Sequence, residues 1–302
     1  MLPRCTTGRD DGSGDKLANP PRSRAIRTLE RANLDQSALR WWVRGRHIAW
    51  WTATRTHQLG RANATRQPPA LALLCIYRSR NDAVVAELIA SLPTPWTPYL
   101  WALDEVSPAL EEHTVGVGAG LRTELLNQLH EHAESQAPET WIAIADDDIS
   151  FLRHSGGLAE CVRYAEASQF DLCQPAHGFG STTSHLITWC HLASVSRLTT
   201  FVEIGPLVII APSLRSAIFP MPVSYGMGLG LEADWMSLVD DGYRLGVIDR
   251  CPLIHHGSIG GEYDNRAGVQ RFRQEIGKLG TYRELVRTLD VWRPWHAAPP
   301  WS

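Results

Sequence analysis

The stretch WIAIADDDISF, residues 141–151, is an apolar run that ends in three consecutive aspartates. Residues 141–145 have the composition of a buried strand, whereas three adjacent carboxylates repel one another. In α/β sheets, ligands bind at the carboxyl ends of the strands, and the aspartates stand at such an end. The stretch therefore predicts a buried strand of an α/β sheet with a ligand site where the strand stops.

Apolar runs and amphipathic segments alternate on both sides of this stretch. The pattern predicts strands at 70–77, 98–104, 141–145, 170–176, 201–210 and 243–249, and helices at 81–92, 121–135, 157–168 and 231–242. Short strands that alternate with helices are typical of a mostly parallel sheet covered on both faces. The expected fold class is therefore α/β.

Composition divides the 302 residues into four parts. Residues 1–22 are rich in Gly, Asp, Pro and Arg, which is typical of a disordered segment. Residues 23–67 predict a basic helical extension with two Trp-Trp pairs, because the prolines that follow disfavour further helix. The α/β domain is expected over 68–285. Residues 286–302 form a tail rich in Pro and Trp, which we expect to pack along the surface or stay loose.

Bulk properties limit the class of protein. The formal net charge of −3 gives no general attraction to nucleic acid. Six scattered cysteines without a C-x-x-C pair favour a reducing, cytoplasmic compartment. No apolar run approaches the ~18 residues that a membrane span needs, and the first residues lack the apolar core of a signal peptide.

Two of the three aspartates suit a metal ion. In an extended segment Asp146 and Asp148 project to one side, while Asp147 points away. Paired carboxylates at a strand end can bind Mg²⁺ or Mn²⁺, whose remaining ligands are water and substrate phosphates. The alternative is a solvated acidic loop or a helix cap, since aspartate caps helices well.

The order of several motifs resembles the GT-A class of glycosyltransferases. These motifs are an acidic residue closing the second strand, a Gly-rich segment with Arg before a helix, a strand ending in D-x-D, GMGLGLEADW (226–235) and PLIHHGS (252–258). Together with QPAH and FVEIGPL they also resemble a family of GT-A-like domains from plants and bacteria. The resemblance covers about residues 70–270 and implies a GT-A-like, Rossmann-like fold. Met227 departs from the family's G-W-G-L pattern, where Trp is expected.

The resemblance assigns a metal site. It implies that Asp146, Asp148 and His255 hold Mn²⁺ or Mg²⁺ against the diphosphate of a nucleotide sugar. The cation would offset the charge of the departing nucleoside diphosphate. We prefer His255 as the third ligand because it directly ends an apolar run, and His256 would then face away or support the ligands. A structural role is the alternative for either histidine.

Other residues are expected to contact the nucleotide. Asp104 closes a strand and could accept hydrogen bonds from a base or ribose, although a turn or cap role is equally compatible. The arginines after the first strand and after GVGAG could bind phosphate. We therefore assign the nucleotide contacts to Asp104, Arg78, Arg80, Arg122 and Asp147.

Acidic residues later in the chain are candidates for the acceptor side. Glu232 and Asp234 stand at the expected start of a helix, where the helix dipole alone would favour them. In the functional interpretation Asp234 is the general base that deprotonates an acceptor hydroxyl, and Glu232 contacts the acceptor or supports the base. Glu203 either pairs with an arginine or lines the acceptor pocket.

These expectations combine into a metal-dependent, inverting glycosyltransferase of the hexosyltransferase kind. It would move sugar from a nucleotide-diphosphate donor to a sugar, a lipid-linked molecule or a small-molecule acceptor. Two alternatives remain open, a nucleotidyltransferase on the same type of sheet and a non-catalytic binding module. The basic, Trp-bearing extension at 23–67 could serve the second alternative, or bring the enzyme to a membrane surface.

Overall fold

The computed structural model describes residues 68–302, except positions 94, 137–138, 153–155, 179, 182, 184, 192–193 and 258–265. The expected disordered segment 1–22 and the helical extension 23–67 lie outside the described residues. Both therefore stay predictions. Within the part that the structure describes, no helix is both long enough and apolar enough to cross a membrane.

The described strands form one ten-stranded sheet. Along the sheet the order is β10-β7-β9-β6-β8-β4-β1-β2-β3, and β5 pairs with β9 beside this path. The strands are β1 (Leu71–Tyr77), β2 (Thr97–Ala102), β3 (Thr114–Val117), β4 (Trp141–Asp146), β5 (Ile149–Phe151), β6 (Leu172–His177), β7 (Ser196–Thr199), β8 (Leu207–Ile210), β9 (Leu245–His255) and β10 (Thr288–Trp292).

The parallel pairings fall into two groups. Strands β4, β1, β2 and β3 run parallel to one another, and β6 runs parallel to β9. Antiparallel β8 joins the two groups by pairing with both β4 and β6. Together with the helices on both faces, this sheet confirms the expected α/β class.

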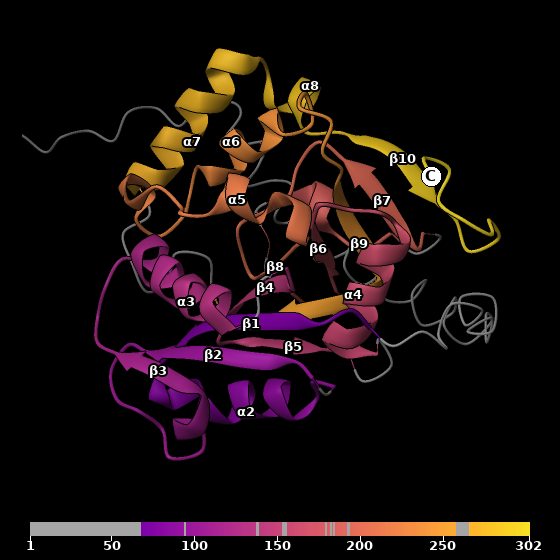
Figure 1. Ribbon diagram of the computed structural model, residues 1–302. Helices are drawn as coiled ribbons and strands as arrows, with labels where there is room; N and C mark the ends of the chain where they lie inside the picture. The colour runs from indigo at the N-terminus through magenta and orange to yellow at the C-terminus, as the bar shows by residue number, and fades with distance from the viewer. Residues whose placement is uncertain are drawn as a thin grey trace, which may run out of the picture. The chain divides into compact units, whose positions relative to one another are not determined.

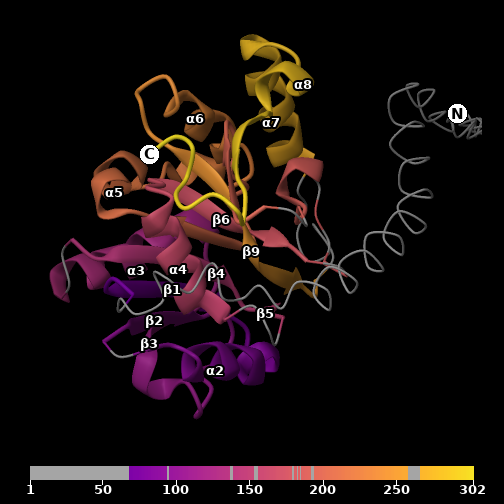
Figure 2. The ribbon, with the colours of Figure 1, turned by 90° about the vertical axis from the view of Figure 1, so that its right-hand side faces the viewer.

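Helices cover both faces of the sheet (Figure 1). They are α2 (Asp82–Ala90), α3 (Arg122–Gln136), α4 (Gly157–Ala167), α5 (Arg215–Ile218), α6 (Leu231–Ser237), α7 (Arg266–Leu279) and α8 (Tyr282–Leu285). Alternate residues of β1 pack on opposite sides, as strand geometry requires. Leu71 and Leu73 join a core with α2 and α4, whereas Ala72 and Leu74 join a core with α3, α5 and α6. Helix α7 packs beside α6 and α8 (Figure 2).

The C-terminal tail is not a separate surface segment. Strand β10 pairs antiparallel with β7 and extends the sheet, and Trp292 at its end is buried. Further on, Trp301 stacks on Phe170 and donates its indole N–H to the carbonyl of Ser168. Tryptophans of the tail therefore contribute to the core on the α4 side. The domain boundary expected at residue 285 stays a prediction.

The carboxyl ends of β1, β2 and β4 lie at one edge of the parallel group, because neighbouring strands share direction and register. Residues that follow these strands are therefore brought together, although they are far apart in sequence. Strand β4 ends at Asp146, and a two-residue turn leads into β5, which pairs with the end of β9. This arrangement places the end of a late strand beside the aspartates.

Candidate active site

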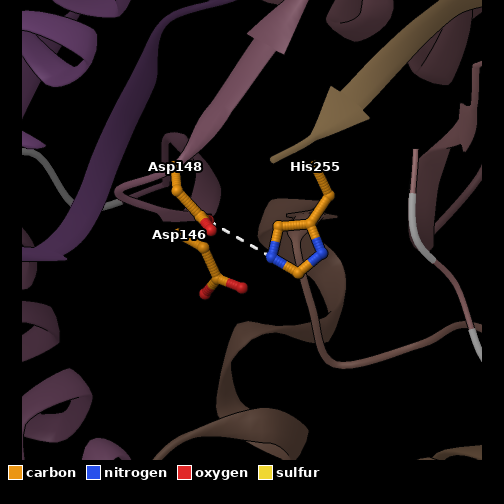
Figure 3. A group of neighbouring side chains, drawn as sticks. All are labelled: Asp146, Asp148 and His255. Atoms are coloured by element: carbon orange, nitrogen blue, oxygen red, sulfur yellow. Dashed lines mark ion pairs between the residues drawn. The ribbon is translucent and has the colours of Figure 1, made fainter. Parts of the chain in front are cut away.

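Three side chains that could hold a metal ion meet at this edge. Asp146, Asp148 and His255 each offer a ligand atom, and these atoms all lie within 4.8 Å of one another. Figure 3 shows the two carboxylates and the imidazole turned toward a common space. The Nε2 atom of His255 lies 3.2 Å from Oδ1 of Asp148.

The turn after β4, and not strand alternation, brings the carboxylates together. Asp146 is the last residue of β4, whereas Asp148 lies in the turn before β5. Pairing of β5 with β9 sets Ile149 opposite His255. The backbone N–H of His256 donates to the carbonyl of Asp148 over 3.0 Å, which fixes the turn against β9. Strand alternation was expected to bring Asp146 and Asp148 to one side. That explanation is wrong, since only Asp146 belongs to the strand.

The neighbours of the cluster face other partners. A carboxylate oxygen of Asp147 accepts a hydrogen bond from the backbone N–H of Arg78 over 2.8 Å, so it ties the turn to the end of β1. His256 is exposed, and its Nε2 lies 2.8 Å from the hydroxyl of Ser150. The structure thus places His255, and not His256, beside the aspartates.

Charges in the cluster are partly offset by protein groups. Arg122 at the start of α3 donates through Nη2 to Oδ1 of Asp146 over 2.7 Å. Burial raises the pKa of Asp146, and the charges of Arg122 and His255 counteract only part of this effect. Burial would also raise the pKa of Asp148, but the hydrogen bond and charge of His255 outweigh it, and the pKa is lowered.

The histidine shows the reciprocal effect. Burial alone would lower the pKa of His255, but the hydrogen bond and negative charge of Asp148 outweigh burial, so the pKa is raised. The protonated form of His255 is therefore favoured beside Asp148, and a metal ion bound here would replace that proton. The donor set of two carboxylates and one imidazole fits Mn²⁺, and its oxygens also suit Mg²⁺. The three residues are only partly buried, which leaves the cluster open to further ligands.

A cavity of about 550 Å³ opens beside the cluster. Asp104 and Arg122 line it together with the three aspartates and His255. Asp104 accepts hydrogen bonds from the backbone N–H groups of Ser79 and Glu105, and these bonds lower its pKa. It therefore fixes the loop after β1 and also presents an ionised carboxylate to the cavity.

The two arginines after β1 differ in position. Arg78 lines the cavity, whereas Arg80 is not among the described residues that do so. Arg80 belongs to a short 3-10 turn (Ser79–Asn81) that leads into α2. Of the expected nucleotide contacts, the structure therefore gathers four, Asp104, Arg78, Arg122 and Asp147, around one space.

The acidic pair on α6 is divided between two environments. Glu232 is buried and lines the cavity, and its carboxylate accepts the backbone N–H of Gly230 over 2.7 Å. Burial raises its pKa to about 7. Asp234 is exposed, accepts a hydrogen bond from the hydroxyl of Tyr225, and is not among the described lining residues. The structure therefore brings Glu232 to the cavity and leaves Asp234 outside, contrary to the expectation for the base.

Two histidines of the cavity wall received no role from the sequence. His177, at the end of β6, and His185 line the cavity together with Glu203. Glu203 lies 3.4 Å from His177 Nε2, and its partner is thus a histidine where an arginine was considered. His177 closes the stretch QPAH, and its position at a strand end was the signal that could have identified it.

Comparison with solved structures finds partial likenesses of the fold. The crystal structure of S. aureus TarS 1-349 is 11% identical and has a TM-score of 0.40, covering 60% of this chain and 58% of that chain. The crystal structure of GalNAc-T7 with UDP, GalNAc and Mn²⁺ is 10% identical and has a TM-score of 0.47, covering 69% of this chain and 48% of that chain. The chain thus matches about half of each structure's length.

At these sequence identities the two likenesses concern the fold alone, and they carry no activity over to this protein. No family model and no curated protein matches the sequence. The described sheet has the mostly parallel, helix-covered α/β architecture that was expected from the sequence, with Asp146 at the end of β4.

Proposed function

We propose that this protein is a metal-dependent glycosyltransferase that moves a sugar from a nucleotide-diphosphate donor to an acceptor hydroxyl. The observation that carries the proposal is the cluster of Asp146, Asp148 and His255 at the carboxyl ends of parallel strands, beside a cavity that also holds Arg122. Ligands of α/β sheets collect at such an edge, and phosphates are the usual partners of a cation held by few protein ligands.

In this proposal Asp146, Asp148 and His255 hold Mn²⁺ or Mg²⁺. When bound, the cation would supply Lewis-acid stabilisation of the charge that forms on the leaving diphosphate. Arg122 is already aligned on Asp146 at 2.7 Å, and its guanidinium can bind a phosphate with two parallel hydrogen bonds. Asp104 and Arg78 lie at the ends of β2 and β1, where they could contact ribose, base or phosphate.

We assign the general base to Glu232 in place of Asp234. Glu232 lines the cavity, and its pKa of about 7 lies near the pH at which a general base works best. Backbone N–H groups of Gly230 and Ile204 hold its carboxylate in position. A base of this kind on the acceptor side suits an inverting displacement. Asp234, exposed on the same helix, would then only anchor Tyr225.

The binding of nucleotides tests the proposal most directly. Thermal unfolding of the purified chain would be followed with UDP, GDP and their hexose conjugates, with Mn²⁺ or with a chelator. We expect a shift to higher temperature that needs both nucleotide and metal, because only the folded state binds them. Release of nucleoside diphosphate, followed with and without free sugars, would then detect hydrolysis and transfer.

The alternatives predict different outcomes. A nucleotidyltransferase would prefer nucleoside triphosphates and release pyrophosphate, and a binding module would show no turnover with any nucleotide. Absence of a metal-dependent shift with every nucleotide would contradict the proposal. We further propose that the protein is cytoplasmic. If its acceptor is lipid-linked, residues 23–67 would make a peripheral contact with the membrane.

A further inference from the structure

Two buried nitrogen atoms on β6 have no hydrogen-bond partner among the residues that the structure describes. They are Nε2 of Gln174 and Nε2 of His177, and both residues are almost fully buried. An unsatisfied buried donor costs about 1–3 kcal/mol, so native proteins retain few of them. Because His177 also lines the cavity beside the metal cluster, a bound ligand is a natural partner for its ring.

The neighbours of the two ring nitrogens indicate the tautomer of His177. The hydroxyl of Ser181 accepts the backbone N–H of His255 over 2.9 Å and lies 2.7 Å from Nδ1 of His177. The hydroxyl can therefore donate its own proton to Nδ1, although its second lone pair could also accept from that atom. Because a carboxylate oxygen of Glu203 lies near Nε2, we infer that the ring proton is on Nε2 and that Nδ1 accepts from Ser181. That N–H faces a carboxylate oxygen of Glu203 at 3.4 Å, but the two atoms are not aligned as a hydrogen bond. The donor is thus held in place without being satisfied.

Glu203 connects the two unsatisfied groups. Its backbone N–H donates to Oε1 of Gln174 over 2.6 Å, which uses the oxygen of that amide and leaves the NH₂ group without a partner. The carboxylate of Glu203 lies against the cavity and has a long contact of 3.3 Å to the hydroxyl of Thr183. The ring of His177 and the carboxylate of Glu203 therefore both face the cavity, whereas Gln174 is not among the described lining residues and holds the backbone of Glu203.

The chemistry of this place selects a neutral, hydroxyl-rich ligand. Glu203 and Glu232 both line the cavity, so an anionic group here would face two carboxylates. The guanidinium of Arg122, which also lines the cavity, is paired with Asp146. A hydroxyl group can donate to a carboxylate and accept from an imidazole N–H at the same time. Neighbouring hydroxyls of a sugar ring offer this combination repeatedly.

We propose that His177 and Glu203, the latter positioned by the bond of its backbone N–H to Gln174, form a subsite that recognises the hydroxyl groups of a hexose. The inference rests on the proposed function and extends it, because it assigns the cavity wall next to the metal cluster to the sugar and not to the nucleotide. The hexose is either the donor's sugar or a sugar acceptor. In both cases His177 donates from Nε2 to a ring hydroxyl, and Glu203 accepts from one.

Two substitutions of His177 separate the two ring nitrogens. In His177→Asn the side-chain oxygen can still accept from Ser181, but the group at Nε2 is lost. In His177→Gln the amide reaches the position of Nε2, but the contact with Ser181, and through it the support of His255, is lost. A third variant, Glu203→Gln, removes the carboxylate charge and leaves the backbone bond to Gln174 in place. Thermal unfolding would verify that each variant folds.

The measurement compares dissociation constants for UDP or GDP with those for the matching nucleotide hexoses, all with Mn²⁺. Free hexoses, tested by ligand-observed NMR and as acceptors, form a second arm. We expect His177→Asn to lose about tenfold in affinity for the sugar-containing probe, as the loss of one hydrogen bond to a buried group implies. Affinity for the nucleotide alone should change less than about twofold, because the metal cluster is untouched. His177→Gln should retain more of the sugar affinity.

The outcomes distinguish the inference from the function on which it rests. A loss confined to nucleotide hexoses supports a donor-sugar subsite, and a loss confined to free hexoses supports an acceptor subsite. If no sugar-containing probe separates His177→Asn and Glu203→Gln from the wild type, the inference is overturned even when metal-dependent nucleotide binding is present. Absence of nucleotide binding in the wild type would instead contradict the proposed function, and the free hexoses would still decide on the subsite.

Discussion

Ile149 of β5 lies directly opposite His255 of β9 in an antiparallel pair. This register carries the preceding residue, Asp148, to the imidazole, where Nε2 of His255 lies 3.2 Å from Oδ1. A shift of one residue in the pairing would turn every side chain of the short strand to the other face and would separate the two groups. The pairing of β5 with β9 is therefore what assembles the candidate metal site.

The first prediction concerns the ligands themselves. Asp148→Asn should weaken Mn²⁺-dependent nucleotide binding at least about tenfold, because an amide is a poorer ligand for a hard cation than a carboxylate. Titration calorimetry with Mn²⁺ and UDP or GDP would measure the effect. The matched control is Asp147→Asn, whose remaining oxygen can still accept the N–H of Arg78. Equal effects of the two substitutions would refute the assignment of the ligands.

A second prediction uses the glycine beside the cluster. A Cβ atom added at Gly257 would overlap with the Oδ2 atom of Asp148, so Gly257→Ala should displace that carboxylate. We expect weaker Mn²⁺ binding in a protein that still folds, measured by titration of the metal alone. Gly277→Ala is the control, because a Cβ atom there meets nothing within 4 Å. Unchanged metal affinity in Gly257→Ala would argue against a ligand role for Asp148.

The third prediction separates two arginines that sequence analysis had grouped together. Arg122→Gln should weaken binding of nucleoside diphosphates by about tenfold or more, because it removes the charge in the cavity wall to which we assign phosphate binding. Arg80→Gln should change the dissociation constant less than about twofold, since Arg80 is not among the described lining residues. The two constants, measured with Mn²⁺ present, check this prediction. A larger effect of Arg80→Gln would move the nucleotide away from this cavity.

The fourth prediction follows from the pKa of Glu232, which burial raises from 4.5 to about 7. The folded protein therefore binds this proton more tightly than the unfolded chain does. As a consequence, the free energy of unfolding falls as the pH rises from about 4.5 to 7, by up to about 3 kcal/mol. Urea unfolding at a series of pH values would measure the fall.

In Glu232→Gln this part of the pH dependence should be absent, because the amide does not titrate. Asp234→Asn is the control on the same helix and should keep the wild-type profile, since Asp234 is exposed. If turnover is detected, Glu232→Gln should also lose most of it, whereas Asp234→Asn should retain it. A pH profile of stability shared by Glu232→Gln and the wild type would show that Glu232 is not buried in this way.

The fifth prediction concerns a fully buried ion pair that supports the sheet. Arg197 of β7 binds Asp249 of β9 through Nε and Nη2, over 2.8 and 2.9 Å, and neither side chain is exposed. Arg197→Met leaves a buried carboxylate without its cation and should cost about 3–5 kcal/mol of unfolding free energy. Lys278→Met, which removes an exposed pair with Glu275, should cost less than about 1 kcal/mol. Similar costs in urea unfolding would contradict this account.

Local sequence features were sufficient for the elements of the parallel group. The apolar run at 141–145 became β4, and the segments expected at 70–77 and 121–135 became β1 and α3 within two residues. Burial on both faces requires continuous apolar residues, and an amphipathic helix requires its periodicity, so both leave a pattern in the sequence. The position of the aspartates at a strand end followed from the same pattern.

Tertiary structure alone decided what faces the cavity. Strands β5, β7 and β10 are short and gain their stability from remote partners, so nothing in their own residues marked them. Glu232 and Asp234 lie about 200° apart around α6, and only the packing of that helix against the sheet determined that Glu232 turns inward. The sequence by itself determined which residues could bind a metal ion, because carboxylate and imidazole chemistry is local. The long-range pairing of β5 with β9 determined that they meet.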